Sequence, residues 1–347
     1  LLCACSRRTA TSSYIQVAKE AFGKTGGYVT TVLLLTLTFF VIIAYMILVR
    51  DIWTGVVQFF AGGAEFTTAE SNTVLVVSFE YNDDHPEAIA AAKMVADSWS
   101  DVLRAFPIMS LAYLCHASPS ILVNILSVQA KLVNPTRDRL KGVIHGATGL
   151  GSILYTFLGL FGYFYAYDNT KDDILLNFDP QDGVILVGRL GLGVTMLCAV
   201  PMMVLPCRDA LKDLARDLLH SFQECYGGNA GKGGNGGGNG GEAGGGPDGS
   251  RNVAGKLCRL LTFVVTTLCI LGVCLYAAVS LPGVAVVWSI CGSSVGFLVG
   301  YILPALFYLR IRRAKPMNAR KAGAYLMLVV ATAAMILCTQ EAVSAAF

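Results

Sequence analysis

The sequence predicts an all-α integral membrane protein with about seven transmembrane helices. Of its 347 residues, 54% are hydrophobic and only 14% are charged, and the mean hydropathy is +0.60. Several apolar stretches also reach the roughly 20 residues that a helix needs to cross a hydrocarbon core of about 30 Å. A water-soluble domain of this composition would expose too much apolar surface, so the bilayer is the expected solvent.

Seven apolar stretches account for the expected spans, because each can satisfy its backbone hydrogen bonds internally as a helix. Arg50 and Asp51 close the first stretch, and a cluster of polar residues interrupts the second. In chain order, the expected spans are 28–49, 106–128, 143–167, 184–207, 260–281, 284–309 and 322–345.

The loops between these spans alternate between basic and acidic, and basic loops favour the cytoplasmic side of a membrane. Basic residues gather before the first span, after the second and at 310–321, whereas 50–105 and 168–182 are rich in Asp and Glu. The N-terminus is therefore expected in the cytoplasm. The predicted organisation is a cytoplasmic N-terminal segment 1–27, a first transmembrane part 28–207 with an external acidic loop 50–105, a cytoplasmic Gly-rich linker 208–256, and a C-terminal transmembrane part 257–347.

Several other functions are disfavoured by the sequence. A net charge of +3 is too small to indicate a nucleic-acid partner, and no metal-ligand spacing accompanies the pair Cys115 and His116. The hydrolase-like pattern G-x-S-x-G at 292–296 lies in an apolar helical run, not after a strand. We therefore predict no enzymatic activity, no cofactor and no metal. The glycines at this place recur every four residues, at Gly292, Gly296 and Gly300, and predict a groove where another helix packs closely.

The second stretch carries polar residues at a depth where a lipid-facing helix would not tolerate them. Pro119 lacks a backbone donor and clashes with the preceding turn, so the helix is expected to break near 115–119 and to free backbone groups. Such groups are tolerated in a membrane only inside the protein or beside a polar cavity. Broken helices in transporters direct these groups at a substrate near the midplane, so the predicted binding residues here are Cys115, His116, Ala117 and Ser118. The alternative is a simple proline kink with His116 satisfied by a neighbour.

Two further spans offer candidate residues. Thr31, Thr38 and Tyr45 are seven residues apart and share one helix face, which either lines a cavity or consists of hydroxyls bonded to their own turns. Thr195 lies near the middle of its span, and Arg189 lies near the outer boundary, where we expect it to snorkel or to pair with an acidic loop residue.

The sequence resembles the amino acid/auxin permease family, which shares the amino acid transporter transmembrane domain, as an incomplete, protozoan-like member. The residues that carry the likeness are YIQVAKEAFGKTGGY with the following AYMILVRDIW, FPIMSLAYLCH, LFGYFYAY, VGRL, VPMMVLPCRDAL and GSSVGFLVGYILPALFYL. The resemblance implies a partial leucine-transporter-type inverted-repeat bundle, in which the first span matches the family's third helix and the break matches the sixth. Helices one, two, four and five are then absent from this chain.

The resemblance also implies secondary active transport of amino acids by alternating access. Together with the residues named above, the predicted substrate-binding set is Tyr113, Cys115, His116, Ala117, Ser118, Thr38, Tyr45 and Thr195. Proton coupling is expected and sodium less so, because sodium-using relatives carry hydroxyls where Leu197 and Ala199 align. The expected setting is a multi-pass protein of the plasma membrane or of a vacuolar or lysosomal membrane, with lipid and an amino acid as partners and an oligomeric state that stays open. An inactive, truncated form is a further expectation, and a nutrient-sensing receptor on the same scaffold is the alternative.

Overall fold

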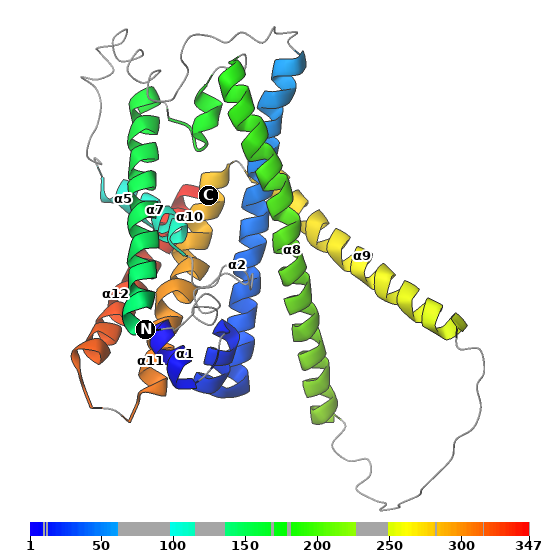
Figure 1. Ribbon diagram of the computed structural model, residues 1–347, viewed down its shortest axis with the longest axis vertical. Coiled ribbons are helices and arrows are strands. Elements are labelled where there is room, and N and C mark those ends of the chain that lie inside the picture. Colours follow the sequence, from blue (N-terminus) through cyan, green and yellow to red (C-terminus); the bar gives the residue numbers. More distant parts are fainter. Residues whose placement is uncertain are drawn as a thin grey trace, which may run out of the picture.

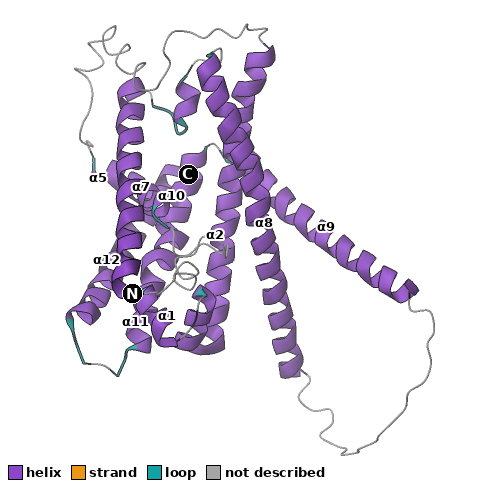
Figure 2. Cartoon of the chain, in the orientation of Figure 1, coloured by secondary structure: helices purple, strands orange, loops and turns teal. Residues whose placement is uncertain are grey.

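A computed structural model describes residues 1–9, 11, 13–61, 98–114, 136–167, 170–178, 182–226, 249–281, 283–314 and 316–346. Every regular element in these ranges is helical, and Figure 2 shows no strand among them. Six of the described helices are long and apolar enough to cross a membrane. These candidate spans are Tyr14–Phe60, Lys141–Ala166, Gly183–Arg216, Leu261–Ser280, Val284–Ile311 and Ala319–Ser344. The predicted all-α membrane fold is confirmed, while most of the second expected span, 106–128, lies outside the described ranges.

The elements follow one another in a simple order (Figure 1). Short helix α1 and long helix α2 begin the chain, α5 and α7 come next, and the 3₁₀ turn η2 precedes α8 and α9. A continuous helix then contains α10, the π-helical turns η3 and η4, and α11, and α12 ends the chain. Their bounds are Leu2–Thr9, Tyr14–Ala61, Trp99–Ala112, Arg137–Ala166, Ile174–Asn177, Gly183–Tyr226, Gly249–Ser280, Val284–Cys291, Gly292–Gly296, Leu298–Ile302, Leu303–Ile311 and Ala319–Ala346.

Helix α2 is the centre of the bundle. One side of it packs on α8 and α9 through a buried cluster that includes Leu35, Ile42 and Cys274. Another side packs on the helix that contains α10 and α11, through residues such as Leu34 and Phe307. Burial of a large aliphatic or aromatic side chain stabilises by about 1.5–3 kcal/mol in water, whereas close packing is the main source of association inside lipid. Figure 1 shows α9 diverging from α8 toward its Gly249 end.

The described helices extend beyond several of the expected spans. Helix α2 begins at Tyr14, 14 residues before the expected start at 28, but it is kinked at Gly23, whose backbone (φ 71°) favours glycine. Its first part is fixed to α11, because the Tyr14 ring packs edge-on against Phe307 at 5.5 Å between centroids. Likewise, α8 continues to Tyr226 and α9 begins at Gly249, so helices occupy both ends of the expected linker 208–256.

Candidate functional site

The predicted substrate site is centred on the end of helix α5. This helix has 14 residues, so at 1.5 Å per residue it extends about 21 Å, less than the roughly 30 Å of a hydrocarbon core. It begins with a Ser98 side chain that accepts a hydrogen bond from the Ser100 amide, and it stops at Ala112. Tyr113 (φ −92°, ψ 5°) and Leu114 are already outside the helix. The regular helix therefore ends just before the predicted break at 115–119.

The glycines of the neighbouring helix position α5. A Cβ at Gly292 would lie 2.5 Å from the Pro107 carbonyl oxygen, and one at Gly300 would lie 2.9 Å from Leu114 Cδ1. Gly296 faces Leu111 in the same way, because a Cβ there would lie 3.2 Å from Leu111 Cδ1. The predicted glycine groove is confirmed, and the helix that occupies it is α5.

The helix on which α5 packs departs from regular α-helical geometry. Two successive π-helical turns, η3 and η4, lie between α10 and α11. Their carbonyl groups accept hydrogen bonds from other helices: Tyr14 Oη donates to Val299 O at 2.8 Å, and Thr339 Oγ1 donates to Ser293 O at 3.1 Å. Single π-bulges occur frequently at functional sites, because they re-aim backbone groups. The sequence reasoning missed this feature, and its one available signal was the density of small residues at 292–296.

Cys115, His116, Ala117 and Ser118 lie outside the described residues, as does Pro119. Tyr113, which directly precedes them, reaches toward α7: its hydroxyl donates to Ser152 Oγ at 3.0 Å, and its ring meets Tyr155 edge-on at 5.5 Å. It thereby joins the end of α5 to α7.

The predicted threonines use their hydroxyls within their own helices. Thr38 is buried and donates to Leu34 O at 2.7 Å. Thr31 Oγ1 donates to Gly27 O at 2.9 Å, and the exposed Thr195 donates to Gly191 O at 2.8 Å. These bonds match the packing interpretation of the stripe. Tyr45, the third member of the stripe, is half-buried. Among the described residues, no hydrogen bond joins Thr38, Tyr45, Tyr113 and Thr195 to one another.

Arg189 holds a loop at the end of α8. The residue is 3% exposed, and its Nη2 donates to the carbonyl groups of Leu175 at 2.8 Å and Phe178 at 3.0 Å. Nearby, burial raises the pKa of Asp173; Asp51 adds to this effect, while a hydrogen bond from the Leu175 amide and the charge of Arg189 oppose it. The expected structural role of Arg189 thus involves backbone carbonyls of the acidic loop.

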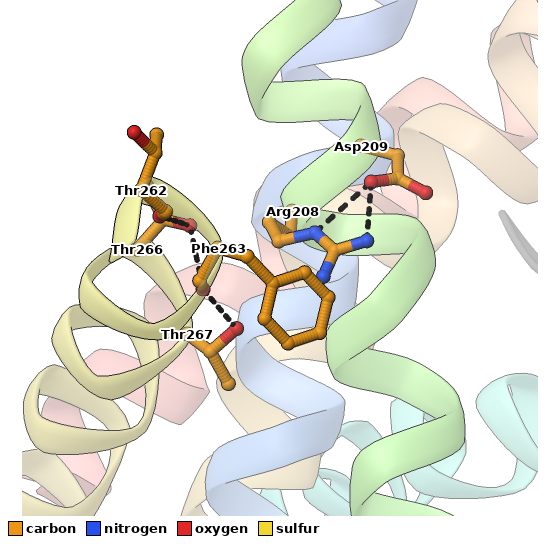
Figure 3. Close-up of polar contacts among 6 residues, drawn as sticks. All are labelled: Arg208, Asp209, Thr262, Phe263, Thr266 and Thr267. Atoms are coloured by element: carbon orange, nitrogen blue, oxygen red, sulfur yellow. Dashed lines mark hydrogen bonds and ion pairs between the residues drawn. The ribbon is translucent and has the colours of Figure 1, made fainter. Parts of the chain in front are cut away.

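A second buried arginine joins α8 to α9. The Arg208 guanidinium carbon lies 4.1 Å from the centre of the Phe263 ring, and Nε and Nη2 donate to Asp209 Oδ1 at 3.0 and 2.7 Å (Figure 3). Cation–π contacts of this kind contribute about 0.5–2 kcal/mol. The sequence predicted Arg208 only as the first residue of the linker 208–256, and no role was expected for its side chain.

Most of the chain resembles known membrane proteins. Residues 73–344 match the family model described as "Transmembrane amino acid transporter protein". "Solute carrier family 38 member 10" of Mus musculus is 26% identical over 249 residues, covering 70% of this chain and 19% of the relative. Its Rattus norvegicus counterpart is 24% identical over 298 residues, covering 84% and 24%.

A third relative carries a more specific name. "Putative sodium-coupled neutral amino acid transporter 10" of Xenopus laevis is 24% identical over 244 residues, covering 70% of this chain and 20% of the relative. In all three alignments this chain spans no more than about a quarter of the relative's length.

Proposed function

Because this chain belongs to the transmembrane amino acid transporter protein family, a family of transporters rather than enzymes, we propose that it takes part in secondary active transport of amino acids by alternating access around the break near 115–119. The observation that carries this proposal is the end of α5 at Ala112. A helix that stops inside a bundle frees carbonyls and leaves a negative dipole end, which suits an ammonium group or a coupling cation.

The surroundings of α5 support the same function. The close contact of α5 with Gly292 fixes the position of this helix. The π-helical turns of the neighbouring helix are a second stretch of irregular backbone. Irregular backbone inside a membrane is tolerated where it is buried in protein or lines a cavity. The end of α5 and the π-helical turns on which it packs are therefore neighbouring stretches of irregular backbone, which supports a binding site at the end of α5.

We propose a proton as the coupling ion, with His116 as the group that carries it, since imidazole titrates near neutral pH. Sodium is the second candidate, favoured by the name of the Xenopus laevis relative, which calls it sodium-coupled. Against sodium stands the side chain of Thr195, which is exposed and bonded to its own turn. The cytoplasmic position of the N-terminus belongs to this proposal, as do the plasma-membrane and vacuolar locations.

Uptake by the purified chain in proteoliposomes tests the proposal. Tritiated neutral and basic amino acids are offered under a pH gradient, a sodium gradient, both or neither, with the outside at about pH 5.5 to supply protons. We expect accumulation that follows the pH gradient and disappears in His116→Gln. The matched control is His145→Gln, because His145 is exposed on α7.

The same assay distinguishes the alternatives. Accumulation that follows sodium alone would overturn proton coupling and leave amino acid transport standing. Saturable binding without accumulation would indicate a receptor. Neither binding nor accumulation by a folded chain would indicate the inactive, truncated form.

A further inference from the structure

A separate cavity of about 290 Å³ lies between α5, α10 and α12. It adjoins the beginning of α5, at residues 101–108, and is therefore distinct from the end of that helix at Ala112. Its polar lining comes from Asp101, Arg104 and Ser289, and its apolar lining includes Ile108, Val286 and Ala342. This size lies just below the roughly 300–1,000 Å³ typical of small-molecule sites and suits a ligand as small as an amino acid.

Two opposite charges reach this cavity from one helix. Asp101 and Arg104 are three residues apart on α5, so they share a face of the helix. Arg104 Nη2 is 3.9 Å from Glu341 Oε2, at the outer limit of an ion pair, and the Arg104 side chain is 49% exposed. A guanidinium has five N–H donors, so most of those of Arg104 are available to a ligand.

Asp101 and Ser289 also have unused bonding capacity. Within the described part of the chain, no ion pair or side-chain hydrogen bond engages the Asp101 carboxylate. The Ser289 hydroxyl oxygen is buried and has no hydrogen-bond partner among the described residues. A buried hydroxyl without a partner is costly, so a polar ligand atom in the cavity would satisfy it.

We propose that this cavity is a second binding site for a zwitterionic amino acid with an apolar side chain. Arg104 binds the α-carboxylate with help from Ser289, and Asp101 binds the α-ammonium group. Ile108, Val286 and Ala342 surround the side chain. The inference rests on the proposed function for the identity of the ligand class, and in the proposed orientation it places a capture site at the outer end of α5.

Equilibrium binding of tritiated L-leucine to the full chain in lipid nanodiscs tests the inference. Isoamylamine lacks the carboxylate and isocaproic acid lacks the ammonium group, so neither should displace leucine from this site at concentrations where unlabelled leucine does. Because a hydrogen bond to a charged group contributes strongly, Asp101→Asn and Arg104→Gln should each weaken binding at this site about tenfold or more.

Matched controls come from the exposed first turn of α7. Asp138→Asn and Arg139→Gln remove the same two charges at exposed positions away from the cavity and should leave leucine binding unchanged. Ala285→Phe, which introduces a ring from the cavity wall, should abolish binding at this site. The thermal unfolding midpoint of each variant is compared with the wild type, so that a folding defect is recognised.

The outcomes separate this inference from the proposed function. Wild-type affinity and stoichiometry in Arg104→Gln and Ala285→Phe would overturn the cavity site, whatever the uptake assay gives. Absence of leucine binding to the wild type would also overturn it. Binding that these variants remove, in a chain that accumulates no amino acid under any gradient, would support the cavity site and overturn transport.

Discussion

Gly292→Ala tests how closely α5 is fixed to its neighbour. The added Cβ would lie 2.5 Å from the Pro107 carbonyl oxygen and 2.9 Å from its carbonyl carbon. Both are backbone atoms, so no side-chain rotation relieves the contact and α5 itself must move. Overpacking costs about 1–3 kcal/mol, and rigid backbone places this case at the upper end. Replacing a helical glycine by alanine returns up to about 1 kcal/mol, so we expect a net loss of about 2 kcal/mol in the free energy of unfolding.

The measurement is the thermal unfolding midpoint of the purified chain in one detergent, supported by a denaturant titration. Gly272→Ala is the matched control, because a Cβ at Gly272 on α9 meets nothing within 4 Å. Gly300→Ala should be intermediate, since its 2.9 Å contact is with the end of the flexible Leu114 side chain. If Gly292→Ala proves as stable as Gly272→Ala, the packing of α5 in the glycine groove is wrong.

Three further results follow from contacts elsewhere. Arg189→Met removes two charge-assisted hydrogen bonds, so the free energy of unfolding should fall by about 3 kcal/mol and amide exchange at 174–178 should accelerate; Arg216→Met, at a site 76% exposed, should change stability by less than about 0.5 kcal/mol. A double-mutant cycle of Arg208→Met and Phe263→Leu should give a coupling of about 1 kcal/mol, and a coupling of zero would contradict the cation–π contact. Burial raises the pKa of the Cys5 thiol from 9.0 to about 11. The contribution of the neutral Cys5 thiol to the free energy of unfolding should therefore be complete below pH 9.0 and decline as the pH rises toward about 11. Maleimide labelling of Cys5 that is as fast in the native protein as in the denatured protein would contradict this burial.

The sequence predicted the fold class and the glycine groove for physical reasons. Apolar stretches of membrane-spanning length have few stable alternatives to a helix, which is why six expected spans correspond to described helices. The spacing of Gly292, Gly296 and Gly300 indicates a surface without side chains on one helix face, and close approach is its main use. The identity of the packing partner required the structure, because any neighbouring helix could use such a surface.

Helix ends and the hydrogen bonds of the site were less predictable. Arg50 and Asp51 were expected to close the first span, yet α2 continues to Ala61, and Arg50 bonds both Asp51 and the Ala278 carbonyl group. Charged residues mark the edge of an apolar run, but helical hydrogen bonding continues beyond it. The pairing of Arg104 with Glu341 joins residues that are far apart in the sequence, and no local pattern encodes that contact.

The two π-helical turns also change which residues after them share a helix face with those of α10. An α-helix advances about 100° per residue, and each wide turn accommodates roughly one additional residue. A helical wheel extended from α10 therefore misplaces the residues after η4 by a rotation on the order of 200° about the helix axis. Phe307 and Tyr308 nevertheless point into the protein, at 0% and 2% exposure. An insertion or deletion of one residue within 292–302 would thus act as a rotation of α11 about its axis, turning these two rings from protein toward lipid.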